Sequence, residues 1–111
     1  MLSKDRRLNL KKDFKWVASG KKTYTSSFKL MYRFGSNPHP LVGIALSSQF
    51  FRKANKRNRA RRLTSKSVEN IYKQLRKDLN LVIMPKPEVL NTKQEDLSRE
   101  LKYVKDIFTA D

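Results

Sequence analysis

Positive charge in this sequence is concentrated in one short stretch, residues 52–62, where seven of eleven residues are Lys or Arg and none is acidic. An amphipathic run follows directly, so the stretch is predicted to form the first turns of a long helix. Cations at a helix N-terminus are disfavoured by roughly 0.3–1 kcal/mol each, because that end already carries about half a positive charge. A polyanion would reverse the effect, since phosphate is attracted both by the free backbone N–H groups and by the cationic side chains.

We therefore expect this end of the helix to face nucleic acid. The alternative is a solvated basic face, which is the usual role of a charge run. It would require the cations to lie at the unfavourable end of the helix with no acidic partner inside the stretch. The side chains that could contact phosphate are Arg52, Lys53, Lys56, Arg57, Asn58, Arg59, Arg61 and Arg62.

A second candidate surface combines a strand with the first helix. Residues 27–34 alternate, which places aromatic and apolar side chains on one face and Lys29, Met31 and Arg33 on the other. With Phe14 or Trp16 they could form a groove with aromatic and basic walls. Such a groove suits single-stranded nucleic acid, because bases stack while cations follow the phosphates. In the alternative, Phe14 and Met31 fill the core beneath the first helix, and the sequence leaves both possibilities open.

Catalytic side chains are not expected. His39 is the only histidine and lies between two prolines, so neither a histidine metal cluster nor a histidine-based triad can be built. There are no cysteines, which excludes disulfides and a thiol nucleophile. With only three glycines, the chain has no phosphate-cradling loop. We expect a binding protein that holds no metal or cofactor of its own.

Composition limits the partners. The 111 residues include 26 Lys or Arg against 10 Asp or Glu, a formal net charge of +16, which attracts polyanions at long range. No apolar run approaches the ~20 residues of a membrane span, and residues 1–12 lack the apolar segment of a secretory signal. We expect a single domain over residues 1–111 in the cytoplasm, with no membrane partner and a partly ordered, extended arm at residues 1–10.

The elements that would position these side chains follow from periodicity and turn signals. Gly20 is predicted to end the first helix in a left-handed conformation, and Thr92 with Glu95 to form a capping box. Phe50 and Phe51, before the long helix, are predicted core anchors, with exposed stacking as the alternative. The predicted helices span residues 11–19, 54–77 and 93–108, and the predicted strands span residues 21–25, 27–34, 41–47 and 79–84.

The order strand–helix–strand over residues 41–84 implies one parallel pair within an otherwise antiparallel sheet. The expected fold is therefore α+β, an α-β-β-β-α-β-α two-layer sandwich with a mixed four-stranded sheet. In the third strand, small residues such as Gly43 alternate with Val42, Ile44 and Leu46, which leaves room for close packing on one face.

Residues 57–63, RNRARRL, resemble the RNR motif of the protein subunit of bacterial ribonuclease P. The resemblance extends along the chain in order and approximate spacing: Arg7-Leu8, then Asp13-Phe14, Phe28 in a strand, residues 42–47, and the region around residues 85–87 with the final helix. The sequence departs from the family pattern before the motif, where Ser48-Gln49 and Arg52-Lys53 stand in place of a lysine pair and a glycine. It also lacks a second aromatic residue near Ala18, for which Trp16 can substitute.

The resemblance implies a fold with a left-handed β–α–β crossover and a function in transfer RNA maturation. In this family a large catalytic RNA removes the 5′ leader of precursor tRNA using magnesium, while the small protein binds that RNA and contacts the leader. The protein itself would supply no catalytic residue, and no protein partner would be required. The motif residues, with Arg52, Lys53 and Lys56, would contact the catalytic RNA. Phe14, Trp16, Lys29, Met31 and Arg33 would line the leader groove, with Met31 or Tyr32 at the usual strand aromatic.

Two other functions fit parts of the sequence. A general RNA-binding protein of ribosomal or chaperone type would explain the charge without a dedicated catalytic RNA. A cationic helix on a membrane surface is disfavoured, because the helix after residue 53 has little exposed apolar surface.

Overall fold

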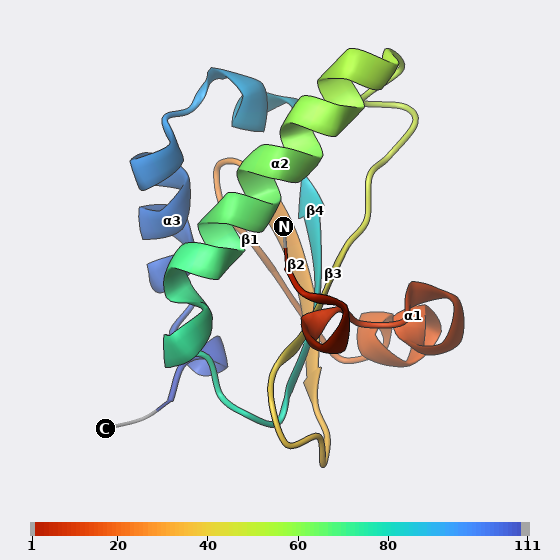
Figure 1. Cartoon of the computed structure of the whole chain (residues 1–111), viewed down its shortest axis with the longest axis vertical. Helices are drawn as coiled ribbons and strands as arrows, with labels where there is room; N and C mark the ends of the chain where they lie inside the picture. The colour runs from red at the N-terminus through yellow and green to blue at the C-terminus, as the bar shows by residue number, and fades with distance from the viewer. Residues whose placement is uncertain (1, 110–111) are drawn as a thin grey trace.

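A four-stranded mixed sheet lies at the centre of the computed structural model, which describes residues 2–109 (Figure 1). Its strands lie in the order β1-β2-β4-β3, with β3 and β4 parallel and the other two pairs antiparallel. The predicted α+β class, the order of the elements and the mixed sheet are confirmed. The strands are β1 (Lys21–Tyr24), β2 (Phe28–Phe34), β3 (Leu41–Ile44) and β4 (Leu79–Pro85).

Helices pack on both faces of this sheet. α2 (Ala54–Ile71) and α3 (Gln94–Lys102) cover one face, and α1 (Leu10–Ala18) crosses the other (Figure 1). Successive side chains of each strand point to opposite faces of the sheet. In β4, Leu81 belongs to the core beneath α2 and α3, whereas Val82 belongs to the smaller core beneath α1. Helix α1 thus adds a layer outside the expected two-layer sandwich. The left-handed turn of the β3-α2-β4 crossover stays a prediction.

The long helix ends earlier than its periodicity predicts. α2 stops at Ile71 and is followed by a 3-10 turn, Tyr72–Gln74, instead of continuing to Lys77. The turn is held by tertiary contacts, because the Tyr72 hydroxyl donates to the carbonyl of Pro40 and Leu75 pairs with Phe108 in an isolated bridge. Ala60, Thr64, Val68 and Ile71 form the buried stripe of α2, and Leu75 is buried although it lies beyond the end of the helix.

The last helix is also shorter than predicted, and its predicted capping box is wrong. The N-cap of α3 is Lys93, which makes no side-chain capping bond. The Thr92 hydroxyl instead donates to the carbonyl of Glu88, in the 3-10 helix Pro87–Asn91 that closes β4. After Lys102, a 3-10 turn, Lys105–Ile107, brings Ile107 and Phe108 back onto the core.

Gly20 is required by close packing and not by a left-handed backbone. No residue within 2–109 has a positive φ, so the predicted left-handed cap is wrong. A Cβ at Gly20 would lie 2.5 Å from the carbonyl oxygen of Tyr32, a backbone atom of the central sheet. The third strand shows the packing that its small residues predict, since a Cβ at Gly43 would lie 2.6 Å from Leu10 Cδ2.

The N-terminal arm is docked along the edge of β3. Arg7 forms a parallel bridge with Val42, and the Leu8 N–H donates to the Val42 carbonyl at 3.1 Å. Leu2 is buried in the core beneath α2, and its N–H donates to the Ser65 hydroxyl. Leu8 is buried on the opposite face, beneath α1. The arm therefore wraps around the sheet edge and contacts both cores.

The free energy of unfolding should fall above pH about 10, and less so in Tyr32→Phe. Burial raises the pKa of Tyr32 above its ordinary value of 10.0, and the hydrogen bond donated to Asp106 raises it further. A tyrosine with a raised folded-state pKa stabilises the protein below the unfolded pKa, and this stability is lost as the pH rises through the folded value. Urea unfolding across an alkaline series measures the slope. Tyr103→Phe, at an exposed tyrosine, is the control, and an unchanged slope in Tyr32→Phe would contradict the prediction.

Candidate nucleic-acid interface

The predicted basic stretch forms the N-terminal turns of α2 and the residues just before it. The N-cap, Lys53, makes no side-chain capping bond, and the first turn contains no acidic residue. Nothing in the local sequence therefore offsets the positive end of the helix dipole. Six of the eight predicted contact residues are exposed: Arg52, Lys53, Lys56, Asn58, Arg59 and Arg62.

The other two predicted residues, Arg57 and Arg61, are partly buried and also shape the site. Arg57 donates to the carbonyls of Phe51 at 3.0 Å and Arg52 at 3.1 Å. It thus holds the connector, residues 45–53 between β3 and α2, against the start of α2. Arg61 lies 3.4 Å from Asn58 Oδ1 and lines a cavity of about 170 Å³ between the N-terminal arm and α2. Arg7, from the arm, lines the same cavity, which brings a cation from the start of the chain beside the motif.

The ion pairs among residues 2–109 lie elsewhere in the molecule. They join Lys21 to Asp106, Arg76 to Asp78, and Arg99 to Asp96. The cations of residues 52–62 are thus satisfied by backbone carbonyls, by Asn58 or by solvent, which leaves their charge available to an external anion.

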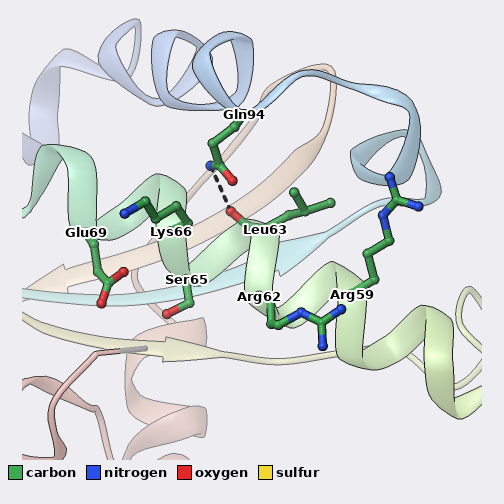
Figure 2. Close-up of a pocket in the computed structure, with 7 residues that line it drawn as sticks. All are labelled: Arg59, Arg62, Leu63, Ser65, Lys66, Glu69 and Gln94. Carbon is green, nitrogen blue, oxygen red and sulfur yellow. Dashed lines mark hydrogen bonds between the residues drawn. The ribbon is translucent and has the colours of Figure 1, made fainter.

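One face of α2 extends this charge beyond the predicted stretch. Arg59, Arg62 and Lys66 follow at helical spacings of three and four, and they line a shallow cavity of about 630 Å³ (Figure 2). Figure 2 shows both guanidinium groups extending away from the helix, while Gln94 of α3 reaches back to the carbonyl of Leu63. Lys66 is exposed and was not among the predicted contact residues. Its place one turn after Arg62 was the available signal.

The predicted leader groove is divided by α1. Trp16 and Arg33 form one pair at the C-terminal end of the helix, with the guanidinium carbon 4.9 Å from the indole centroid. Arg33 also donates to the Ser19 hydroxyl at 2.9 Å. Phe14 is two residues from Trp16, about 200° around the helix, so it lies on the opposite flank. The five predicted residues therefore do not line a single groove.

Met31 is buried beneath α1. Its side chain is 3% exposed and packs in the core with Val17 and Val82, while Phe14 packs at the margin of this core. For Met31, the core-filling alternative is therefore correct, and its assignment to the wall of an open groove is corrected. Met31 points to the α1 face and Tyr32 to the α2 face, so Met31 is the one of the two that lies on the sheet face crossed by α1.

An open part of the sheet remains beyond α1 on the Phe14 flank. Lys29 lies on this face, two residues before Met31, and pairs across the sheet with Met84 and Tyr24. Tyr24 is exposed, and Phe50 in the connector is also exposed, whereas Phe51 is buried. The prediction that both phenylalanines anchor the core is therefore correct for Phe51 and wrong for Phe50. Tyr24 was not among the predicted site residues. Its place opposite Lys29 in the hairpin was the feature that indicated it shares this face.

The single histidine, the remaining side chain considered for catalysis or metal binding, has a structural role. His39 Nε2 lies 2.6 Å from the carbonyl oxygen of Asp5 and helps to hold the N-terminal arm. Among the described residues, no three His, Cys, Asp or Glu side chains are grouped so that they could hold a metal ion. No helix in the same part of the chain is long and apolar enough to cross a membrane.

Comparison with known proteins agrees with this geometry. The fold, with the exposed cationic end of α2, is that of a small α+β protein of the nucleic-acid-binding class. The family model described as Ribonuclease P matches residues 2–108, so the chain belongs to the ribonuclease P protein family. The ribonuclease P protein component of Nitrosococcus oceani is 31% identical over 91 residues, which span 81% of this chain and 76% of the relative.

Solved structures share the fold. The RNase P protein of Thermotoga maritima superimposes with a TM-score of 0.80 at 22% identity, covering 93% of this chain and 98% of the other. The Staphylococcus aureus RNase P protein gives a TM-score of 0.76 at 15% identity, covering 94% and 98%. The chain is the protein subunit of the ribonuclease P ribonucleoprotein, which acts in tRNA processing. The alternative of a general RNA-binding protein finds no support in these matches.

Proposed function

We propose that the chain binds the catalytic RNA of ribonuclease P through the N-terminal turns of α2, and that the open sheet face beside α1 receives the 5′ leader of precursor tRNA. One observation carries the first part: a run of cations begins an uncapped helix without an acidic residue in its first turn. Such a helix end, with its side chains, offers phosphate both N–H donors and full positive charges.

The leader surface is supported by the arrangement around Phe14. On this flank of α1 the sheet presents Lys29 and Met84 with the exposed Tyr24 nearby, a combination of aromatic, apolar and cationic groups that suits unpaired nucleotides. In this proposal Trp16 and Arg33, which contact each other on the far flank of α1, lie outside the surface that receives the leader.

The protein is proposed to position RNA and to leave the chemistry to its partner. The phosphodiester would be cleaved within the catalytic RNA, with magnesium bound by RNA, in the cytoplasm. The protein would raise the affinity for precursor tRNA by neutralising phosphates close to the cleavage site.

Reconstituted cleavage tests this proposal. The protein alone should leave precursor tRNA intact, and its addition to the catalytic RNA at low magnesium should increase leader removal. The increase in substrate affinity should require a leader, so the affinity for mature tRNA serves as the internal control. Cleavage that is unchanged by the protein at low magnesium would overturn the proposal.

A further inference from the structure

Two exposed side chains on the far flank of α1 have no part in the proposed leader surface. Trp16, the only tryptophan of the chain, is 40% exposed, and the centroid of its ring lies 4.9 Å from the guanidinium carbon of Arg33. The indole contributes to neither core of the protein. A large aromatic side chain that stays in water forgoes the burial of roughly 150–250 Å² of surface. Core packing therefore does not explain the position of Trp16.

The guanidinium group of this pair is fixed in place. Arg33 Nη1 donates to the Ser19 hydroxyl at 2.9 Å and to the Trp16 carbonyl at 3.4 Å. The indole is held in turn by the loop that follows β2, since a Cβ at Gly35 would lie 3.2 Å from Trp16 Cη2. A cation that is already held in one conformation loses less side-chain entropy when it binds a ligand.

One edge of the same guanidinium group is open. The hydrogen bonds of Arg33 within residues 2–109 all use Nη1, so the N–H groups of Nε and Nη2 are available on the adjacent edge. Two parallel N–H donors match two oxygens of a phosphate. Arg33 also belongs to none of the ion pairs formed within the same residues. No carboxylate of this part of the chain therefore neutralises it.

The surroundings of the pair are cationic. Lys12 is exposed four residues before Trp16, on the same flank of α1. Lys22 is exposed on β1 and lies on the sheet face crossed by α1, since it pairs with Met31. Asp13, which is half-buried, is the only acidic residue between residues 6 and 68. The excess of positive charge favours a polyanion over an acidic peptide of mixed charge.

The N-terminal arm joins this flank to the cationic turns of α2. Residues 2–9 run from a hydrogen bond with Ser65 of α2, along the edge of β3, to the start of α1. Asp5 is the only carboxylate on this path. Its exposed cations are Lys4, Arg6 and Arg7. A polyanion bound at α2 therefore meets further positive charge as it continues along the arm toward the far flank of α1.

We propose that Arg33, stacked on Trp16, binds a backbone phosphate of the catalytic RNA at a second contact, separate from the N-terminal turns of α2. Trp16 is a positioning residue, which holds the guanidinium group while the edge with Nε and Nη2 receives the phosphate. The inference rests on the proposed function, because it extends the contact of the same RNA from α2 along the arm. The leader is not the ligand here, because its proposed surface lies on the opposite flank of α1, beside Phe14.

The first test measures binding of the catalytic RNA, without substrate, by filter binding over a potassium chloride series. Arg33→Gln should weaken binding about 3- to 10-fold at moderate salt and lower the slope of log K against log salt by about 1, because one phosphate contact is lost. Arg33→Lys should keep the wild-type slope, since the charge remains. Its affinity should recover only in part, because an ammonium group lacks the two parallel donors.

A double-mutant cycle tests the role of Trp16. Trp16→Leu should weaken binding about 2- to 5-fold in the wild type and cause no further loss in Arg33→Gln, because the indole acts through the guanidinium group. Trp16→Phe should retain most of the affinity, since an aromatic face remains under the cation. Equal losses from Trp16→Leu in the two backgrounds would overturn the positioning role.

Arg99→Gln is the matched control, because it removes the same group and the same net charge from an exposed arginine of α3. Its only ion pair is with Asp96 at the surface, where such pairs contribute little. Arg99→Gln should keep the wild-type affinity and slope. Wild-type binding in Arg33→Gln, or an equal loss in Arg99→Gln, would overturn the proposal.

The final comparison separates this contact from the proposed function. Weaker binding in the double variant of Arg59→Gln with Arg62→Gln, together with wild-type binding in Arg33→Gln, would overturn the second contact alone. Wild-type binding in both variants would overturn the contact of the protein with the catalytic RNA. The ribonucleoprotein assembled with saturating Arg33→Gln protein should bind precursor tRNA as the wild type does. A loss of affinity seen only in that complex would place the pair on the substrate and would also overturn the inference.

Discussion

Replacing Arg59 and Arg62 together with glutamine should weaken binding of the catalytic RNA about 10- to 100-fold at moderate salt and lower the slope of log K against log salt by about 2. Both side chains are exposed on one face of α2, and the ion pairs of the described residues lie elsewhere. Each substitution therefore removes a charge proposed to contact phosphate, and neither arginine belongs to the three ion pairs named above. Filter binding over a potassium chloride series measures both quantities.

The control for this variant removes the same charge from another part of the surface. Lys102 and Lys105 are exposed at and after the end of α3, away from the start of α2. Lys102→Gln with Lys105→Gln should leave the slope close to that of the wild type. Equal losses in the two double variants would mean that net charge alone drives binding, and α2 would then have no special place in the interface. Arg57 is unsuitable for this test, because its guanidinium group also holds the connector.

Phe51→Ala should lower the free energy of unfolding by about 3–5 kcal/mol, the usual cost of deleting a fully buried phenyl ring. Phe51 is 1% exposed and fixes the connector that leads into α2. The variant should also bind RNA more weakly, because Arg57 donates to the carbonyl of this residue and the cationic turns would lose their position. Urea denaturation monitored by circular dichroism measures the loss of stability.

The adjacent residue provides the comparison for this second prediction. Phe50→Ala removes the same group from a side chain that is 54% exposed, and it should change stability by no more than about 0.5 kcal/mol. A similar loss in both variants would show that the connector is held by its backbone and not by the buried ring.

Periodicity predicted most of the fold. The alternation in β2 separates the two faces correctly, since Leu30 and Tyr32 lie in the core beneath α2 and α3, and Met31 lies in the core beneath α1. The ends of the helices were less accessible, because they depend on distant contacts. The bridge of Leu75 to Phe108 and the hydrogen bond of Tyr72 to Pro40 join residues 33 and 32 positions apart, and local patterns do not carry such information.

The candidate site was likewise only partly predictable from the sequence. The cationic stretch was visible in the sequence, because its residues are contiguous and their placement in a helix follows from the run beside them. The division of the groove was not visible in the sequence, because the direction in which α1 crosses the sheet depends on tertiary packing. That crossing separates Trp16 from Phe14 and covers Met31. Likewise, no local pattern distinguishes Phe50 from Phe51, since only the path of the connector decides which ring turns inward.

The docked N-terminal arm has a practical consequence for anyone who attaches a label to this protein. Leu2 donates a hydrogen bond to Ser65 of α2, so a peptide fused ahead of it would emerge beside the helix that carries Arg62. At the other end, Thr109 bonds to the carbonyls of Gln74 and Leu75, past the opposite end of α2. Affinity tags and fluorophores therefore belong after the C-terminus, where they are least able to obstruct the cationic turns.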